Sequence, residues 1–171
     1  MNVPVRRAVT TDAPAMAQVL RRSITELCVA DHGNDPQRLG PWLENKTAAQ
    51  VATWLAAPDN CCVVALLETG ISGVGLVTAK GEIMLCYVDP GARFRGVSAA
   101  LLAALEHHAR ALGLAEVRLE ATLTARRFYG SPRLPATGLR QAGLRHPHLP
   151  GDGQVALRTA AVLYGSSAGS R

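Results

Sequence analysis

An apolar strand that runs through a short basic turn into a helix is the feature that most constrains how this chain can fold. The strand pattern covers Glu82–Val88, the turn is Gly91-Ala92-Arg93-Phe94-Arg95-Gly96-Val97-Ser98, and a helical pattern opens at Ala99. Amide N–H groups in such a turn and in the first turn of a helix have no intrahelical partners, and they lie at the positive end of the helix dipole. This order of parts predicts a binding site for an anion such as a pyrophosphate.

The spacing of residues in the turn separates it from other phosphate-binding loops. A Walker A loop needs Gly-x-x-x-x-Gly-Lys-Ser/Thr, and a dinucleotide fingerprint needs Gly-x-Gly-x-x-Gly. The turn instead reads Arg93-x-x-Gly96-x-Ser98, preceded by Val88-x-Pro90. It resembles the Arg/Gln-x-x-Gly-x-Gly/Ala signature of the GNAT superfamily, the acyl-CoA-dependent N-acyltransferases. Ser98 stands where the family most often has glycine or alanine, and an ordinary strand-to-helix turn is the alternative interpretation.

Length and composition indicate one domain. The chain has 171 residues, of which 48% are hydrophobic, and this is enough for a single buried core. We expect one acetyltransferase-like domain over residues 1–164 and a flexible tail over 165–171. No apolar run approaches the roughly 20 residues of a membrane span. The first residues have no apolar stretch behind their charges, so we expect a cytoplasmic protein with no membrane partner.

Charge and cysteine usage narrow the function classes. The net charge is +5, but the arginines are spread in pairs such as Arg6-Arg7 and Arg126-Arg127, without a dense basic tract or interleaved aromatic residues. This pattern argues against nucleic acid as a partner. The four cysteines show no Cys-x-x-Cys spacing and are expected to be reduced thiols in or near the core. No histidine or cysteine set has metal-ligand spacing, so no metal is expected.

The hydrophobic pattern predicts a mixed sheet with helices. Turns at Gly70 and at Lys80-Gly81 make residues 61–88 an antiparallel meander. A helical crossover makes the strands at 82–88 and 117–121 parallel. The predicted fold class is α/β (α+β), with a GNAT-like mixed central sheet, the order β-α-α-β-β-β-α-β-α and C-terminal strands. The expected strands lie at residues 3–9, 61–68, 73–79, 82–88 and 117–121. Helices are expected after Asp12, after Asn34 or Asp35, after Thr47 and after Ser98.

The resemblance implies acetyl-CoA as cosubstrate. In the family, two neighbouring parallel strands splay apart, and the pantetheine arm of CoA enters the gap and hydrogen-bonds to exposed backbone, much as an added strand does. The pyrophosphate rests on the amides of the basic turn, and arginine side chains add charge. The resemblance therefore implies that the cofactor-binding residues are Cys86, Tyr87, Val88, Arg93, Phe94, Arg95, Gly96, Val97 and Ser98.

Two residues are candidates for proton transfer. An alkylammonium acceptor must lose a proton before it attacks a thioester, and the departing thiolate must gain one. The strand Glu82-Ile-Met-Leu-Cys-Tyr-Val is similar to the Glu-Ile-Val-Phe-Cys-type strand of histone-acetylating members, which implies that Glu82 is the general base. The pair Phe128-Tyr129 implies that Tyr129 is the general acid. A surface glutamate and a packing tyrosine are the alternatives.

The connection between the first two predicted helices is the candidate acceptor site, because loops of this kind often carry recognition. Asp31, His32 and Trp42 lie in or near it, and acidic groups beside an aromatic wall suit a cationic amine. Helix capping and core packing are the alternatives for these residues.

These features predict an N-acetyltransferase that moves an acetyl group from acetyl-CoA to a primary amine, by direct attack in a ternary complex. The acceptor partner is a small molecule or a protein amine. A non-catalytic CoA-binding or regulatory module with the same fold is the alternative function. The sequence leaves open whether the chain forms a homodimer.

Overall fold

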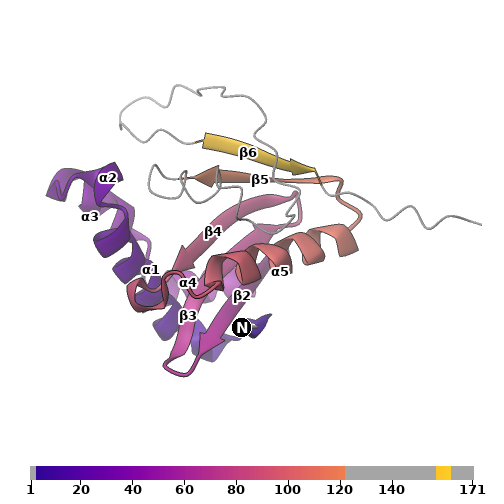
Figure 1. Cartoon of the computed structure of the whole chain (residues 1–171), viewed down its shortest axis with the longest axis horizontal. Helices are drawn as coiled ribbons and strands as arrows, with labels where there is room; N and C mark the ends of the chain where they lie inside the picture. The colour runs from indigo at the N-terminus through magenta and orange to yellow at the C-terminus, as the bar shows by residue number, and fades with distance from the viewer. Residues whose placement is uncertain (1–2, 122–156, 163–171) are drawn as a thin grey trace, which may run out of the picture.

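The computed structural model describes residues 3–121 and 157–162 and places six strands in one sheet, in the order β1-β2-β3-β4-β5-β6 (Figure 1). Neighbouring strands are antiparallel except β4 and β5, which are parallel. The strands are β1 (Val5–Arg7), β2 (Asn60–Leu67), β3 (Gly70–Thr78), β4 (Glu82–Val88), β5 (Glu116–Ala121) and β6 (Leu157–Val162). The predicted meander and the predicted parallel crossover are both confirmed.

The helices lie in two groups along the chain. Between β1 and β2 are the 3₁₀ helix η1 (Thr10–Asp12) and the helices α1 (Ala13–Leu27), α2 (Val29–His32), α3 (Pro36–Glu44) and α4 (Ala48–Ala56). Between β4 and β5 are the 3₁₀ helix η2 (Pro90–Ala92) and α5 (Val97–Ala111). The connection between β1 and β2 thus holds four α-helices. The predicted element order has two helices at this place, although three helix starts were expected there.

Capping side chains set where α3 and α4 begin. The Asp35 carboxylate accepts a hydrogen bond from the Gln37 amide at 2.9 Å, and the Thr47 hydroxyl accepts one from the Gln50 amide at 3.1 Å. The sequence predicted the Thr47 cap and left Asn34 or Asp35 as the cap of the preceding helix. Asp12 is different, because its side chain does not cap α1, which it precedes. Its carboxylate accepts hydrogen bonds from the Val9 amide, at the start of η1, and from the Arg6 guanidinium. The Arg6 contact holds the pKa of the Asp12 carboxyl below its usual value.

Helices cover both faces of the sheet, and each face has its own buried cluster. Residues of α5 pack on one face against alternate residues of β2 such as Cys61 and Val63. Residues of α1 and α4 pack on the other face against Cys62 and Val64. This alternation follows from the two-residue period of a strand. It also buries the adjacent thiols of Cys61 and Cys62 on opposite faces, as expected from the sequence.

Two glycines let α5 lie close against the middle of the sheet. A Cβ atom added to Gly73 would be 2.5 Å from a methyl of Val97 and 2.9 Å from a methyl of Leu101. A Cβ added to Gly75 would be 3.1 Å from Leu105. The first turn of α5 is therefore held against β3 at a distance that only glycine allows. This contact positions the turn that precedes α5.

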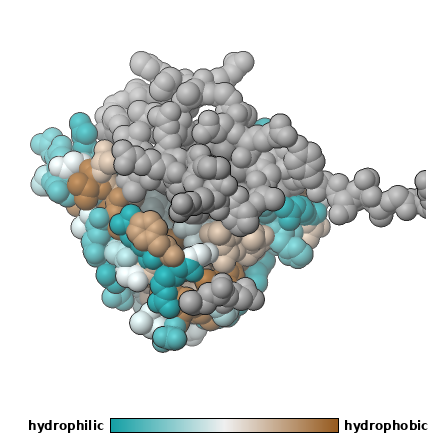
Figure 2. Space-filling model, viewed as in Figure 1, coloured by the Kyte–Doolittle hydropathy of each residue, from teal (hydrophilic) through white to brown (hydrophobic). Residues whose placement is uncertain are grey.

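The described surface is mixed in polarity. Figure 2 shows separate hydrophobic areas between hydrophilic ones on the described part of one face. No helix among residues 3–121 has the length and hydropathy that crossing a bilayer requires.

Candidate active site

The parallel strands β4 and β5 are paired over only two residue pairs. Glu82 is opposite Arg118 and Ile83 is opposite Leu119. On its other side β4 stays paired with β3 as far as Val88, and β5 stays paired with β6 to its last residue. Within the described residues, the edge of β4 that faces β5 is therefore unpaired after Ile83. The two strands splay apart there, as the sequence resemblance implied.

A β-bulge in β4 coincides with the start of the splay. Val77 of β3 pairs with Ile83, but the next residue, Leu76, pairs with Leu85, so Met84 is an extra residue without a ladder partner on β3. Bulges bend a strand and increase its local twist. The side chain of Met84 is 60% exposed. The bend explains why β4 leaves β5 at this point and continues along β3.

The turn after β4 is anchored by Asp89. Its carboxylate accepts a hydrogen bond from the Gly91 amide at 2.9 Å, and its own amide donates to the Ser72 carbonyl at 2.9 Å. Arg22 of α1 forms an ion pair with the Asp89 carboxylate at 2.6 Å. The end of β4, the 3₁₀ helix η2 and the helix α1 are thereby held together.

Unpartnered backbone amides converge between η2 and α5. Among the described residues, the N–H groups of residues 93–99 have no hydrogen-bond partner, and the first amide bonded in α5 is that of Ala100, which donates to Gly96. Phe94 has φ +61° and Gly96 has φ +82°. Left-handed residues among right-handed or extended ones turn successive amides toward one concave side, which is the arrangement of an anion-binding nest. An anion bound at this turn would therefore be held by backbone amides, as the sequence predicts.

Cationic and aromatic side chains surround these amides. Arg93 and Arg95 are exposed, and the Arg93 guanidinium lies 4.7 Å from the centre of the Phe94 ring. The Phe94 side chain is 94% exposed. A bulky residue at positive φ costs about 1–3 kcal/mol, and leaving a phenylalanine ring in water forgoes about 1.5–3 kcal/mol of burial. The turn therefore combines positive charge with an aromatic ring held outward at a cost in stability.

Glu82 lies at the first residue pair of β4 and β5. Its side chain is exposed, and its amide donates to the Thr78 hydroxyl at 3.2 Å. The guanidinium of Arg118, its neighbour across the ladder, forms an ion pair with Glu116 at 2.6 Å. No ion pair of Glu82 occurs within the described residues. Its carboxylate therefore stands beside the bulge and the start of the splay, available to a ligand.

Two of the predicted acceptor residues, Asp31 of α2 and Trp42 of α3, lie near the side chain of Tyr87 on β4. The Tyr87 side chain packs on the α1 face of β4. Burial raises the pKa of the Tyr87 phenol, and the negative charge of Cys28 and Asp31 raises it further, while a hydrogen bond from Trp42 acts in the opposite direction. Asp31 and Trp42 thus lie close to a side chain of β4. Tyr87 was expected to contribute mainly its backbone, and no local spacing in the sequence signals these contacts of its side chain.

His32 does not present a nitrogen to an acceptor, and its prediction as a substrate-binding side chain is corrected. The residue is 1% exposed. Nε2 is 3.0 Å from the Ile24 carbonyl, and Nδ1 accepts a hydrogen bond from the Asn34 amide at 3.0 Å. With both ring nitrogens engaged by backbone, His32 ties α2 to α1. Its ring also meets Trp42 edge-on at 6.3 Å between centroids, so His32 positions a predicted acceptor residue.

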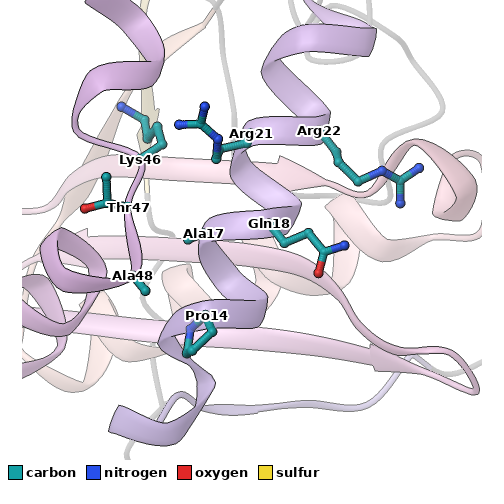
Figure 3. A pocket seen from close by; sticks show the side chains of 8 residues that line it. All are labelled: Pro14, Ala17, Gln18, Arg21, Arg22, Lys46, Thr47 and Ala48. Carbon is teal, nitrogen blue, oxygen red and sulfur yellow. The ribbon is translucent and has the colours of Figure 1, made fainter.

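An open groove of about 520 Å³ lies on the outer side of α1 (Figure 3). Lys46 is 7% exposed, and burial lowers its pKa. Its ammonium donates to the Asn45 side chain and lies 5.8 Å from the Trp54 ring centre. Arg21 reaches from α1 toward Lys46, and its guanidinium donates to the Leu43 carbonyl at 2.9 Å. These contacts tie α1 to the segment before α4.

Several expectations fall outside the described residues. They include Tyr129 with its neighbour Phe128, the pair Arg126-Arg127, and the tail over 165–171. Among residues 3–121, no group of three or more histidine, cysteine, aspartate or glutamate side chains is arranged to hold a metal ion.

Comparison with known proteins identifies the family. A family model for the acetyltransferase (GNAT) domain matches residues 25–132, more than half of the chain. The chain belongs to the GNAT acetyltransferase family. The matched range holds the splay, the amide turn and α5. No curated protein sequence matches this GNAT chain.

Solved structures share the GNAT fold. A GCN5-related N-acetyltransferase from Rhodopseudomonas palustris is 21% identical, with 95% of this chain and 97% of that chain covered and a TM-score of 0.77. The PaiA N-acetyltransferase of Thermoplasma acidophilum, in complex with coenzyme A, is 15% identical. The match covers 95% of this chain and 100% of that chain, with a TM-score of 0.72. The ribosomal-protein-S18-alanine N-acetyltransferase of Escherichia coli is 18% identical. The match covers 97% of this chain and 98% of that chain, with a TM-score of 0.60. At these identities the likeness establishes the fold alone.

Proposed function

We propose that this GNAT domain is an acetyl-CoA-dependent N-acetyltransferase that acts on a primary amine. The observation that most supports this function is that an unpaired strand edge and a turn with unpartnered amides are adjacent. The unpaired edge of β4 after Ile83 leads directly into a turn whose amides, over residues 93–99, lack partners in the described structure. An unpaired strand edge suits an amide-containing arm, and converging amides suit a pyrophosphate. CoA carries both groups in that order.

The proposal gives the backbone most of the cofactor contacts. The pantetheine arm hydrogen-bonds to the main chain of Cys86, Tyr87 and Val88, and the pyrophosphate lies on the amides from Arg93 to Ser98. The side chains of Arg93 and Arg95 add positive charge. The PaiA N-acetyltransferase structure, which is in complex with coenzyme A and shares this fold, supports the same ligand class.

Glu82 is the proposed general base. An alkylammonium has a pKa of about 10, so at neutral pH the acceptor must give up a proton before its nitrogen attacks the acetyl carbon. The Glu82 carboxylate takes this proton directly or through water. The carbon–nitrogen bond then forms, the carbon–sulfur bond breaks, and the nitrogen gives up its second proton to water. The departing thiolate takes a proton from Tyr129, which regains one from solvent. The role of Tyr129 rests on the Phe128-Tyr129 resemblance.

The acceptor amine is proposed to enter beside α2 and α3. Asp31 supplies negative charge, and the Trp42 and Tyr87 rings form a wall next to it, which suits an ammonium group. GNAT structures with this fold include the alanine N-acetyltransferase of ribosomal protein S18 and an aminoglycoside 6′-acetyltransferase. Acceptors in proteins and in small molecules are therefore both candidates.

An acceptor screen tests the proposal. The full chain is incubated with acetyl-CoA and separate primary amines, including polyamines, amino acids, aminoglycosides and peptides with free N-termini. Release of the CoA thiol and the mass of the product are measured. We expect amine-dependent thiol release and a product heavier by one acetyl group. Binding of acetyl-CoA without turnover on any amine would identify a CoA-binding or regulatory module, and failure to bind acetyl-CoA would contradict the proposal as a whole.

A further inference from the structure

Phe94 combines a backbone conformation and an exposure that are both unusual for a bulky apolar residue. It is at φ +61°, in the left-handed region that bulky side chains rarely adopt. Its ring is 94% exposed, more than any other large hydrophobic side chain of the described residues. Its only ring contact there is with the Arg93 guanidinium, 4.7 Å from the ring centre. The left-handed backbone that shapes this turn thus also carries an aromatic ring exposed to water.

The position of the ring limits what can cover it. Phe94 belongs to the group of residues whose amides converge between η2 and α5. A ligand whose phosphates lie on those amides brings the next part of its structure to the surface of the same turn. In CoA a single ribose separates the pyrophosphate from the adenine base, so the base cannot lie far from this turn.

We propose that the Phe94 ring, with Arg93 against it, is a stacking platform for the adenine base of CoA. The inference rests on the proposed function, because it requires the pyrophosphate of CoA on the amides of residues 93–99. A purine stacks on an aromatic face and on a guanidinium plane. The Phe94–Arg93 pair offers both surfaces. Phe94 therefore selects the nucleotide half of the cofactor, whereas the amides and the edge of β4 bind the phosphates and the pantetheine arm.

Two ligands, one with and one without the adenosine, distinguish stacking of Phe94 on the base from an effect of Phe94 on the shape of the turn. CoA carries the adenosine, and 4′-phosphopantetheine keeps the pantetheine arm and one phosphate but lacks the adenosine. Phe94→Gly removes the ring and suits a positive φ. We expect Phe94→Gly to weaken CoA binding roughly 5- to 150-fold, the range for loss of one base–aromatic stack. We expect its affinity for 4′-phosphopantetheine to stay within about twofold of wild type.

Phe94→Trp supplies a second measurement. Indole stacks on purines as phenyl does, so this variant should keep the affinity for CoA. Its added tryptophan emission should be quenched by CoA and not by 4′-phosphopantetheine. Leu112→Ala is the matched control, because Leu112 is also an exposed apolar residue, 50% accessible, beyond the other end of α5. It should change neither affinity.

Three results would overturn the inference. Equal loss of both ligands in Phe94→Gly would mean that the residue shapes the turn and does not contact the base. Unchanged CoA affinity in Phe94→Gly, or no CoA-dependent quenching in Phe94→Trp, would mean that the ring meets no base. If wild type binds neither CoA nor 4′-phosphopantetheine, the proposed function itself fails, which is a different outcome from these three.

Discussion

At the scale of single residues, two left-handed positions shape the proposed cofactor turn. Gly96, at φ +82°, adopts its conformation without strain, and Phe94 adopts a similar one at a cost. Among the described residues, a Cβ atom on Gly96 would have only Val3 within 4 Å, at 3.9 Å. The need for glycine at position 96 therefore comes from its backbone angle, and not from crowding by the described residues.

Gly96→Ala should weaken CoA binding and lower stability by about 1 kcal/mol, because alanine resists the positive φ that aims the amides. Wild type at a CoA concentration of 100 times the dissociation constant should gain about 2.7 kcal/mol in unfolding free energy, and the variant should lose most of that gain. Gly113→Ala is the matched control, because Gly113 has φ +76° and open space around it beyond the far end of α5. It should lose stability but keep the CoA-dependent gain, measured by thermal unfolding. A full gain in Gly96→Ala would remove the phosphate site from this turn.

Glu82→Gln should lower turnover roughly 10²–10⁴-fold and leave acetyl-CoA affinity nearly unchanged, because a general base acts on the acceptor amine. The acid limb of the pH–rate profile should flatten in the variant. Glu68→Gln serves as the control, since Glu68 is an exposed glutamate that follows β2. Steady-state rates over a range of pH test this. A wild-type profile in Glu82→Gln would leave Glu82 as a surface residue.

At the scale of elements, α1 connects the acceptor side of the molecule to the cofactor turn. Its last turns contact α2 and α3, where Asp31 and Trp42 lie, and Arg22 on the same helix holds Asp89 at 2.6 Å. Asp89 in turn caps η2. A displacement of α1 would therefore change the turn that is proposed to hold the pyrophosphate.

Arg22→Met should weaken CoA binding by up to about 5-fold, as expected for loss of a partly exposed ion pair worth about 0.2–1 kcal/mol. Asp89→Asn should act through the same contact, so the double variant should lose less affinity than the sum of the two single losses. Arg38→Met, which removes a distant exposed ion pair with Asp35, should have no effect. Titration calorimetry on the four variants provides the measurement. Additive losses would show that Arg22 and Asp89 act independently.

At the scale of the whole molecule, the close contact of α5 with β3 fixes the cofactor turn relative to the sheet. Gly73 and Gly75 leave no room for a side chain beneath Val97, Leu101 and Leu105. The same contact closes the buried cluster on that face. Stability and the position of the amide turn therefore depend on the same packing.

Gly73→Ala should destabilise the protein by about 1–3 kcal/mol, because the added methyl overlaps buried methyl groups of α5. Gly40→Ala is the matched control. Gly40 lies within α3 with nothing within 4 Å of an added Cβ, and alanine favours a helix over glycine by about 1 kcal/mol. Urea unfolding should therefore show opposite signs for the two variants. Equal stability of Gly73→Ala and wild type would contradict the close packing of α5 on β3.

The sequence by itself determined the features that depend on near neighbours in the chain. Periodicity and turn residues predicted β2, β3, β4 and α5 to within a few residues. Thr47 marked the start of α4, and the pair Asn34-Asp35 marked the start of α3. The basic turn was found because an anion site built from backbone amides needs only a strand, a glycine and a helix in order.

Only the tertiary structure decided the features that join distant parts of the chain. The bulge at Met84 is a mismatch in pairing with β3, which the alternation of residues along β4 does not specify. Arg22 and Asp89 are 67 positions apart, and no local spacing signals their ion pair. His32 had the side chain of a ligand-binding residue, but packing buried it between backbone partners. The physical reason is that local propensity acts over one or two turns of chain, whereas burial and pairing partners are set by the whole fold.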